Sequence, residues 1–191
     1  MKILSATVAA LVAVSSPVLA ESWSLEGDAS TVAFGSIKND YTGEAHTFKD
    51  ISGTVDEAGK VTVDINLASV ETFIDIRNER MIANVFGDAA KATVTAEIDL
   101  AALNALAVGE SMTFEADATL NLLGVENPLF LTMFVLRLAE DRVLASTDVP
   151  AFIATEDLQI DAGIDALQQI AELDSITRVV PLTARFVFTK D

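Results

Sequence analysis

The stretch 112-MTFEADATLNL-122 determines the fold class, because its apolar and polar residues alternate along its whole length. In a β-strand, successive side chains point to opposite faces of the sheet, so this segment has one apolar face and one polar face. A strand that buries one face and leaves the other in water is typical of antiparallel sheets. We therefore predict an antiparallel β protein built around this segment.

Other segments show the same alternation and extend the prediction along the chain. They are residues 61–67, 92–100 and 180–189, with weaker ones at 23–25, 32–34, 46–48 and 143–153, the last interrupted by Pro150. Residues 129–138 also read as a strand, although they are apolar on both faces. The run Asp56-Glu57-Ala58-Gly59 has the composition of a hairpin turn. Short strands at this spacing predict a barrel or a sandwich.

Two segments break the β pattern. Residues 76–85 contain the charged run Arg77-Asn78-Glu79-Arg80, and residues 164–173 place apolar side chains at helical spacing. We predict a short helix in each segment, with Asp161 capping the start of the second. Because no domain boundary or repeat interrupts the chain, the sequence predicts a single, mostly β domain with one or two short helices.

The first 20 residues have the features of a cleaved signal peptide. Lys2 is the only charge before Glu21, an apolar run follows it, and Val18-Leu19-Ala20 fits the positions that a signal peptidase reads. The apolar run is shorter than the roughly 20 residues that cross a bilayer. We therefore predict a signal peptide at residues 1–20 and one domain at residues 21–191. The protein is expected to be periplasmic or secreted, without stable membrane insertion.

The composition excludes several classes of partner and site. The formal charge is −17 and the isoelectric point is about 4.2, so nucleic acid and anionic lipid headgroups would be repelled by the surface as a whole. The chain has no cysteine, which excludes disulfides and thiolate nucleophiles. With one histidine it cannot supply the His and Cys ligands of a zinc site. The sequence leaves open whether the chain forms a homodimer.

No pattern of residues identifies a catalytic site. The single histidine, His46, lies on a predicted strand beside Phe48, and we expect a structural or exposed role for it. Asp157, Asp161 and Asp165 are spaced four apart, but the alternating pattern of a calcium loop is missing, so a solvated acidic face is expected. An enzyme would need two carboxylates that converge in one pocket with opposite pKa shifts. We predict no catalytic residue and no metal.

The interior of a barrel decides its function, and the sequence allows two interiors. A closed barrel of about eight strands either packs its interior with side chains or holds one ligand. Phenylalanines beside alanines can leave room for a guest, or they can interdigitate into a dry core. Two roles are likewise open to Arg77 and Arg80. They can tie the short helix to the barrel rim by ion pairs, or they can hold a polar headgroup at the mouth.

Three parts of the sequence resemble the YceI-like family. The first is Ser69-Val70-Glu71-Thr72, followed by Arg77-Asn78-Glu79-Arg80-Met81 and Phe86; the second is residues 120–129, Leu-Asn-Leu-Leu-Gly-Val-Glu-Asn-Pro-Leu; the third is the opening with Trp23, Ser30, Val32, Phe34 and Phe48. The likeness covers essentially the whole chain after residue 20. Two positions depart from the family pattern: Arg80 replaces a usual histidine, and Asp157-Leu158-Gln159-Ile160 replaces Asp-Phe-Gly-Ile.

The resemblance implies an extended, lipocalin-like antiparallel β-barrel whose interior binds polyisoprenoid chains, including isoprenoid quinones. It implies no catalytic residue. We therefore predict a periplasmic or secreted carrier that holds an isoprenoid lipid or quinone, with no other cofactor; the alternative is a structural or interaction module with a filled core. The predicted ligand-binding residues are Phe34, Phe48, Phe86, Phe114, Leu120, Phe130, Phe134 and Phe186, with Arg77 and Arg80 as mouth residues.

Overall fold

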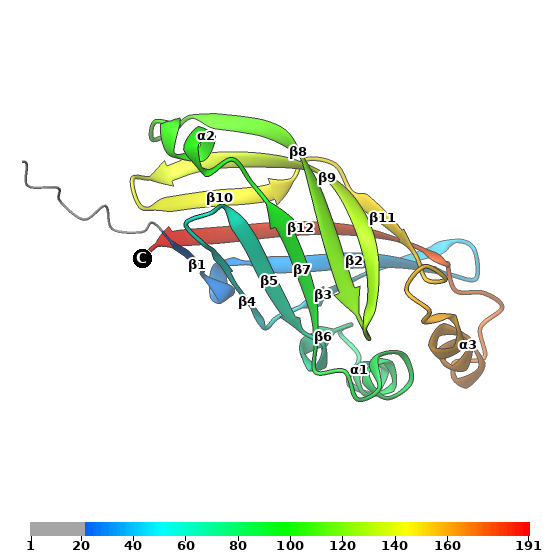
Figure 1. The fold of residues 1–191 in the computed structure, drawn as a ribbon. Coiled ribbons are helices and arrows are strands. Elements are labelled where there is room, and N and C mark those ends of the chain that lie inside the picture. Colours follow the sequence, from blue (N-terminus) through cyan, green and yellow to red (C-terminus); the bar gives the residue numbers. More distant parts are fainter. Residues whose placement is uncertain (1–21) are drawn as a thin grey trace, which may run out of the picture.

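A computed structural model describes residues 22–191, and the predicted signal peptide lies outside the described residues. The chain is mostly β, as predicted (Figure 1). The strands are β1 (Trp23–Leu25), β2 (Thr31–Lys38), β3 (Thr42–Phe48), β4 (Ile51–Val55), β5 (Lys60–Asn66), β6 (Val70–Glu71), β7 (Lys91–Glu97), β8 (Ser111–Leu122), β9 (Val125–Ala139), β10 (Arg142–Thr147), β11 (Ala151–Ala154) and β12 (Val179–Lys190). The helical segments are η1 (Gly27–Ala29), η2 (Leu67–Ser69), α1 (Asp75–Met81), η3 (Ile82–Phe86), α2 (Leu100–Ala105) and α3 (Asp161–Ile170).

The strands close into an antiparallel barrel. Their order is β1-β4-β5-β7-β8-β9-β10-β12, and β12 returns to pair with β1, so the ring has no free edge. The register is continuous over long stretches; all twelve residues of β8 have a partner on β9, from Ser111 opposite Leu136 to Leu122 opposite Val125. This arrangement confirms the predicted antiparallel barrel of about eight strands.

The barrel is extended because several of its strands continue past an interruption. η1 separates β1 from β2, yet both pair with β12. In the same way β4 pairs with β1 and β5, while β3, which precedes β4, pairs with β2 and β6. Pro150 separates β10 from β11, and both also pair with β12. Both parts of the strand interrupted at η1, and both parts of the strand interrupted at Pro150, therefore pair along β12.

Short helices cover the two ends of the barrel. α2 lies at one end, and α1 and α3 lie at the other (Figure 1). The sequence predicted a strand through residue 100, but β7 ends at Glu97 and α2 begins at Leu100. The Asp99 carboxylate caps α2 by accepting a hydrogen bond from the Ala102 N–H at 3.0 Å. A capping aspartate before a run rich in alanine and leucine favours a helix over a strand.

The start of α3 also differs from the prediction. The helix begins at Asp161 itself, and Ile160 occupies the capping position without a side-chain cap. Asp161 does not cap the helix. Its carboxylate accepts a hydrogen bond from the Thr155 hydroxyl and lies 3.7 Å from Arg178. Arg178 also pairs with Asp165 at 2.5 Å, so these two carboxylates share a cation instead of forming only a solvated face.

Gly163 sets the distance between α3 and the π-helical turn η3. A Cβ at this position would lie 2.4 Å from the carbonyl oxygen of Asn84 and 2.8 Å from the Cα of Val85. We predict that Gly163→Ala lowers the free energy of unfolding by about 1–3 kcal/mol, because the backbone atoms that it meets cannot yield without moving an element. This is the expected net loss, after the about 1 kcal/mol that alanine gains over glycine inside a helix. Urea unfolding monitored by circular dichroism measures the loss.

Gly43→Ala is the matched control, because a Cβ at Gly43 would meet no atom within 4 Å. We expect its unfolding midpoint to equal or slightly exceed that of the unsubstituted protein. Equal midpoints for the two alanine variants would show that α3 and η3 can separate at no cost, contrary to the prediction.

Candidate functional site

Three cavities lie in a row inside the described part of the barrel. The middle cavity has a volume of about 190 Å³, the cavity at the α2 end about 370 Å³, and the cavity at the α1 and α3 end about 340 Å³. Phe186 lines both the middle cavity and the α2-end cavity, whereas Phe34 and Met81 line both the middle cavity and the α1/α3-end cavity. Taken together the cavities fall within the roughly 300–1,000 Å³ of a small-molecule site.

The wall of the middle cavity is apolar. Every residue that lines it is aliphatic or aromatic, or is methionine, except Thr147 and Thr155. Alanines at positions 92 and 184 leave space between the larger side chains. No charged side chain lines this cavity, so its wall is suited to burying hydrocarbon. The barrel is therefore hollow along part of its axis.

Most of the predicted pocket residues line these cavities. Phe34, Phe48, Phe86, Leu120 and Phe186 line the middle cavity, and Phe114 lines the α2-end cavity. Phe48 links two of its neighbours, with ring centroids 5.4 Å from Phe34 and 6.0 Å from Phe86. These contacts bring η3 against the β2–β3 hairpin on one side of the cavity, although η3 comes much later in the sequence.

Two of the predicted pocket residues lie elsewhere. Phe130 is 75% exposed, and neither Phe130 nor Phe134 lines any of the three cavities. The alternate residues of β9, Leu129, Leu131 and Met133, form the wall in their place. A shift of one residue moves every side chain of a strand to the other face. Since β9 is apolar on both faces, alternation could not identify the inward one.

Sequence reasoning missed the contribution of α3 and the segment before it. Ile160 and Ile164 line the middle cavity, and Ile164 and Leu167 line the α1/α3-end cavity. The helical spacing of Ile164 and Leu167 was visible in the sequence. Their position in the cavity walls depends on the packing of α3 against η3. No local sequence pattern reveals this contact.

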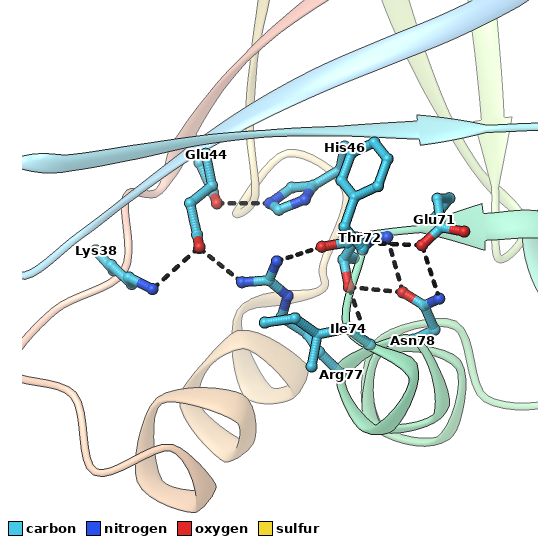
Figure 2. Close-up of polar contacts among 10 residues, drawn as sticks. Lys38, Glu44, His46, Glu71, Thr72, Ile74, Arg77 and Asn78 are labelled. Atoms are coloured by element: carbon cyan, nitrogen blue, oxygen red, sulfur yellow. Dashed lines mark hydrogen bonds and ion pairs between the residues drawn. The ribbon is translucent and has the colours of Figure 1, made fainter.

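The α1/α3-end cavity has a polar wall. Arg77 reaches from α1 to β3, where its Nη1 pairs with Glu44 Oε2 at 2.7 Å, and its Nη2 donates to the Thr72 carbonyl at 2.5 Å (Figure 2). Glu44 also accepts from Lys38 at 3.0 Å. Partial burial acts to raise the pKa of Glu44, but the hydrogen bonds from Arg77 and Lys38 outweigh it, so the pKa is lowered. Arg77 thus ties the short helix to the barrel rim.

His46 lies in the same wall and is only 4% exposed. Its Nε2 lies 2.9 Å from the Ser36 hydroxyl, and its ring contacts Phe34 at a centroid distance of 5.1 Å. Burial, followed by the charge of Arg77, lowers its pKa below the ordinary value of 6.5. The imidazole is therefore neutral at pH 7. His46 was expected to have either a structural or an exposed role, and its burial fits the structural one.

A second polar cluster holds the chain between β6 and α1. The Asn78 side-chain oxygen accepts from the Thr72 backbone N–H at 2.8 Å, and the Thr72 hydroxyl lies 2.6 Å from it (Figure 2). Glu71 accepts from Lys49 at 2.6 Å, from the Phe73 N–H at 2.6 Å and from Asn78 Nδ2 at 3.3 Å. The Lys49 and Phe73 hydrogen bonds lower the pKa of Glu71 to about 2.

This lowered pKa predicts a pH dependence of stability. In the unfolded chain Glu71 protonates near its ordinary value of 4.5, whereas in the folded chain it stays ionised down to about pH 2. Its contribution is therefore complete above about pH 4.5 and is lost as the pH falls towards 2. We expect Glu71→Gln to lose stability at pH 6 and to show a smaller further loss between pH 4.5 and 2.5 than the unsubstituted protein. Urea midpoints across this range measure it.

Glu79→Gln serves as the control, since Glu79 is an exposed carboxylate on the adjacent helix and the charge change is the same. The urea midpoint of Glu79→Gln should change with pH in the same way as that of the unsubstituted protein. If the urea midpoints of the two variants change with pH in the same way, Glu71 is not the source of the predicted pH dependence.

The described residues contain neither a candidate metal site nor a candidate membrane-spanning helix. Between Ser22 and Asp191, no group of three or more His, Cys, Asp or Glu side chains is placed to hold a metal ion. No helix in that range is long and apolar enough to cross a bilayer. The site consists of an apolar middle cavity between two cavities that have charged residues in their walls. These residues are Lys38, Glu44, Arg77 and Arg80 at the α1/α3 end, and Glu97, Asp99 and Glu115 at the α2 end.

The fold and the site define a class: a closed antiparallel barrel with a hollow apolar interior. The YceI-like domain model matches residues 23–188, and the chain belongs to this family. The family expectation from the sequence motifs is thereby confirmed. No curated protein sequence gives a significant match.

Two solved structures share the fold. One is described as a polyisoprenoid binding domain from Saccharophagus degradans implicated in plant cell wall breakdown; it is 37% identical, with a TM-score of 0.86 over 88% of this chain and 98% of that chain. The other is BcnA from Burkholderia cenocepacia, which is 13% identical, with a TM-score of 0.61 over 85% of this chain and 98% of that chain. At that identity BcnA supports the fold alone.

Proposed function

We propose that the protein is a periplasmic or secreted carrier that binds one isoprenoid-type lipid, a polyprenoid or an isoprenoid quinone, inside the barrel. The observation that carries the proposal is the row of neighbouring cavities, which share wall residues and whose middle member has an apolar wall without a charged residue. Burying apolar surface contributes about 25 cal/mol per Å², so a long prenyl tail supplies most of the affinity. The resemblance to the Saccharophagus degradans domain supports the same ligand class.

In this proposal the tail and the headgroup of the lipid bind in different cavities. The tail occupies the middle and α2-end cavities, whose walls share Val94, Leu131, Met133 and Phe186. The polar headgroup lies in the α1/α3-end cavity, near Arg77 and Arg80. The signal peptide predicted at residues 1–20 supports export.

Mass spectrometry of the organic extract tests the proposal on protein purified from the compartment to which it is exported. A single isoprenoid species at close to one molecule per chain is the expected result. Addition of geranylgeraniol to the delipidated protein should then restore binding, measured by calorimetry. If the extract is empty and the delipidated protein binds neither prenols nor quinones, the barrel is an interaction module and the carrier function is wrong.

A further inference from the structure

The barrel wall is continuous at the level of β10 but changes beyond the end of this strand. β10 pairs with β9 as far as Thr147 opposite Met133, and the last bond between them runs from the Asp148 N–H to the Thr132 carbonyl at 2.8 Å. Further on, residues 125–131 of β9 pair with β8 alone, and β11 pairs with β12 alone. β11 lies beside this part of β9 (Figure 1). Within the described part of the chain, β9 and β11 therefore meet at a seam that no ladder hydrogen bond crosses.

Two prolines flank this seam. Pro128 lies within β9, and Pro150 stands directly before β11. Proline has no N–H to donate to a ladder, and inside sheets it is found mainly at edges. Separating two strands costs less where no backbone hydrogen bonds have to break. The seam therefore opens more easily than the paired strands on either side of it.

The seam is apolar through the whole thickness of the wall. Residues 128–131 are Pro-Leu-Phe-Leu and residues 151–154 are Ala-Phe-Ile-Ala, so neither edge carries a polar side chain. On the inner side, three of these residues line the middle cavity: Leu129, Leu131 and Ile153. On the outer side, Phe130 is 75% exposed and Phe152 is 67% exposed. An apolar surface thus continues from the cavity to the outside, because alternate residues of each strand face opposite sides.

The two ends of the barrel offer a less favourable route for hydrocarbon. At one end, α1 is tied to β3 by the Arg77–Glu44 ion pair, and Gly163 holds α3 against the backbone of η3. At the other end, the cavity below α2 has three carboxylates in its wall: Glu97, Asp99 and Glu115. An apolar chain that enters by either end passes charged groups, whereas a chain that crosses the seam passes none.

We infer that the seam between β9 and β11 is a lateral portal, through which the prenyl tail of the ligand enters and leaves the middle cavity. Phe130 and Phe152 make the first contact with the tail outside the wall. Leu129 and Ile153 then receive it inside. This inference rests on the proposed function, because it assigns a route to a lipid that the barrel must bind. Portal opening controls how fast the lipid exchanges, and not how tightly it is held.

A covalent bridge across the seam tests the portal. The chain has no cysteine, so Phe130→Cys with Phe152→Cys supplies its only two thiols. Dibromobimane joins the two thiols and becomes fluorescent when both have reacted; bis(maleimido)ethane replaces it if the thiols lie too far apart for the shorter reagent. Release of bound geranylgeraniol to excess phosphatidylcholine vesicles is followed by mass spectrometry of the vesicle fraction.

The bridged protein should release geranylgeraniol at least tenfold more slowly than the same variant carrying two separate monobromobimane groups. Uptake should slow by the same factor, so that the Kd stays within threefold. Asp117→Cys with Phe130→Cys is the matched control. It keeps one of the two cysteines and bridges β9 to β8, its hydrogen-bonded neighbour, at the directly opposite residue. Exchange in this control should stay within twofold of its own unbridged form.

The outcomes separate the portal from the carrier function. If the bridge across the seam leaves the rates of release and uptake unchanged, the lipid passes through an end of the barrel and the portal is wrong. If both bridges slow exchange equally, or if the seam bridge weakens binding without slowing uptake, the effect is a general one and the portal is likewise wrong. If the unsubstituted protein binds neither prenols nor quinones, the carrier function itself fails.

Discussion

Replacing Trp23 with alanine is expected to lower the free energy of unfolding by about 3–5 kcal/mol, a large part of the roughly 5–15 kcal/mol that stabilises a typical domain. Trp23 is 1% exposed and is the largest fully buried side chain among the described residues. It lies on β1, opposite Val55 of β4 and Lys190 of β12, where the first and last strands close the ring. Its loss leaves a void at the closure and removes the ring beneath Arg137, whose guanidinium carbon lies 5.2 Å from the centroid.

Thermal unfolding monitored by far-ultraviolet circular dichroism measures this loss, because Trp23 is the chain's only tryptophan and its fluorescence disappears with it. A decrease in Tm of roughly 6–20 °C corresponds to the expected change for a domain of this size. Trp23→Phe should lose less than half as much, since it keeps an aromatic face and removes the indole N–H that has no partner among the described residues. Phe130→Ala, at a 75% exposed aromatic residue, is the control. If Trp23→Ala costs no more than Phe130→Ala, the closure does not depend on Trp23.

A block at the junction of two cavities is expected to remove the extra affinity that a long tail has over a short one. Val94 lies on β7 and lines both the middle and the α2-end cavities. Tryptophan at this position fills the passage, so the distal part of a prenyl tail cannot be buried. Excluding about four methylene equivalents costs about 3 kcal/mol. The affinity for geranylgeraniol should therefore fall about 100-fold.

The dependence on tail length distinguishes a block from general damage. In the unsubstituted protein, affinity should rise from geraniol to geranylgeraniol, because the longer tail reaches past Val94. In Val94→Trp the two alcohols should bind almost equally, with geraniol unaffected. Thr95→Trp places the same side chain on the adjacent residue of β7, which lines none of the cavities. Undiminished geranylgeraniol binding by Val94→Trp would show that the tail does not use this passage.

The alternation of apolar and polar residues predicted most of the strands, but it did not show which residues of β9 point into the barrel. In β8, charged residues at Glu115 and Asp117 show which face is wet, so the inward placement of Phe114 and Leu120 could be predicted. In β9, apolar residues occupy both faces from Leu129 to Leu138, and the predicted Phe130 and Phe134 lie outside the cavities. Periodicity identifies a face only where the two faces differ in polarity.

The polar wall was predicted only in part. Arg77 and Arg80 were expected at the mouth because they stand in a charged run, and both line the α1/α3-end cavity. The partnership of Arg77 with Glu44 joins residues 33 positions apart, and no local pattern encodes it. The pKa of His46 is lowered by its burial and by the charge of Arg77 from α1, so this shift could not be derived from its sequence neighbours.

The sequence by itself determined the β class, the antiparallel strands, the family and the apolar character of the interior, because each depends on local alternation or on contiguous motifs. Tertiary structure alone decided that the ring closes between β1 and β12, that neighbouring cavities share wall residues, and that Lys38, Arg77 and Arg80 gather at one end of an acidic protein. These properties arise from contacts between segments distant in the chain. Their geometry is fixed only when the whole barrel packs, because the space inside it is what all the strands together leave unfilled.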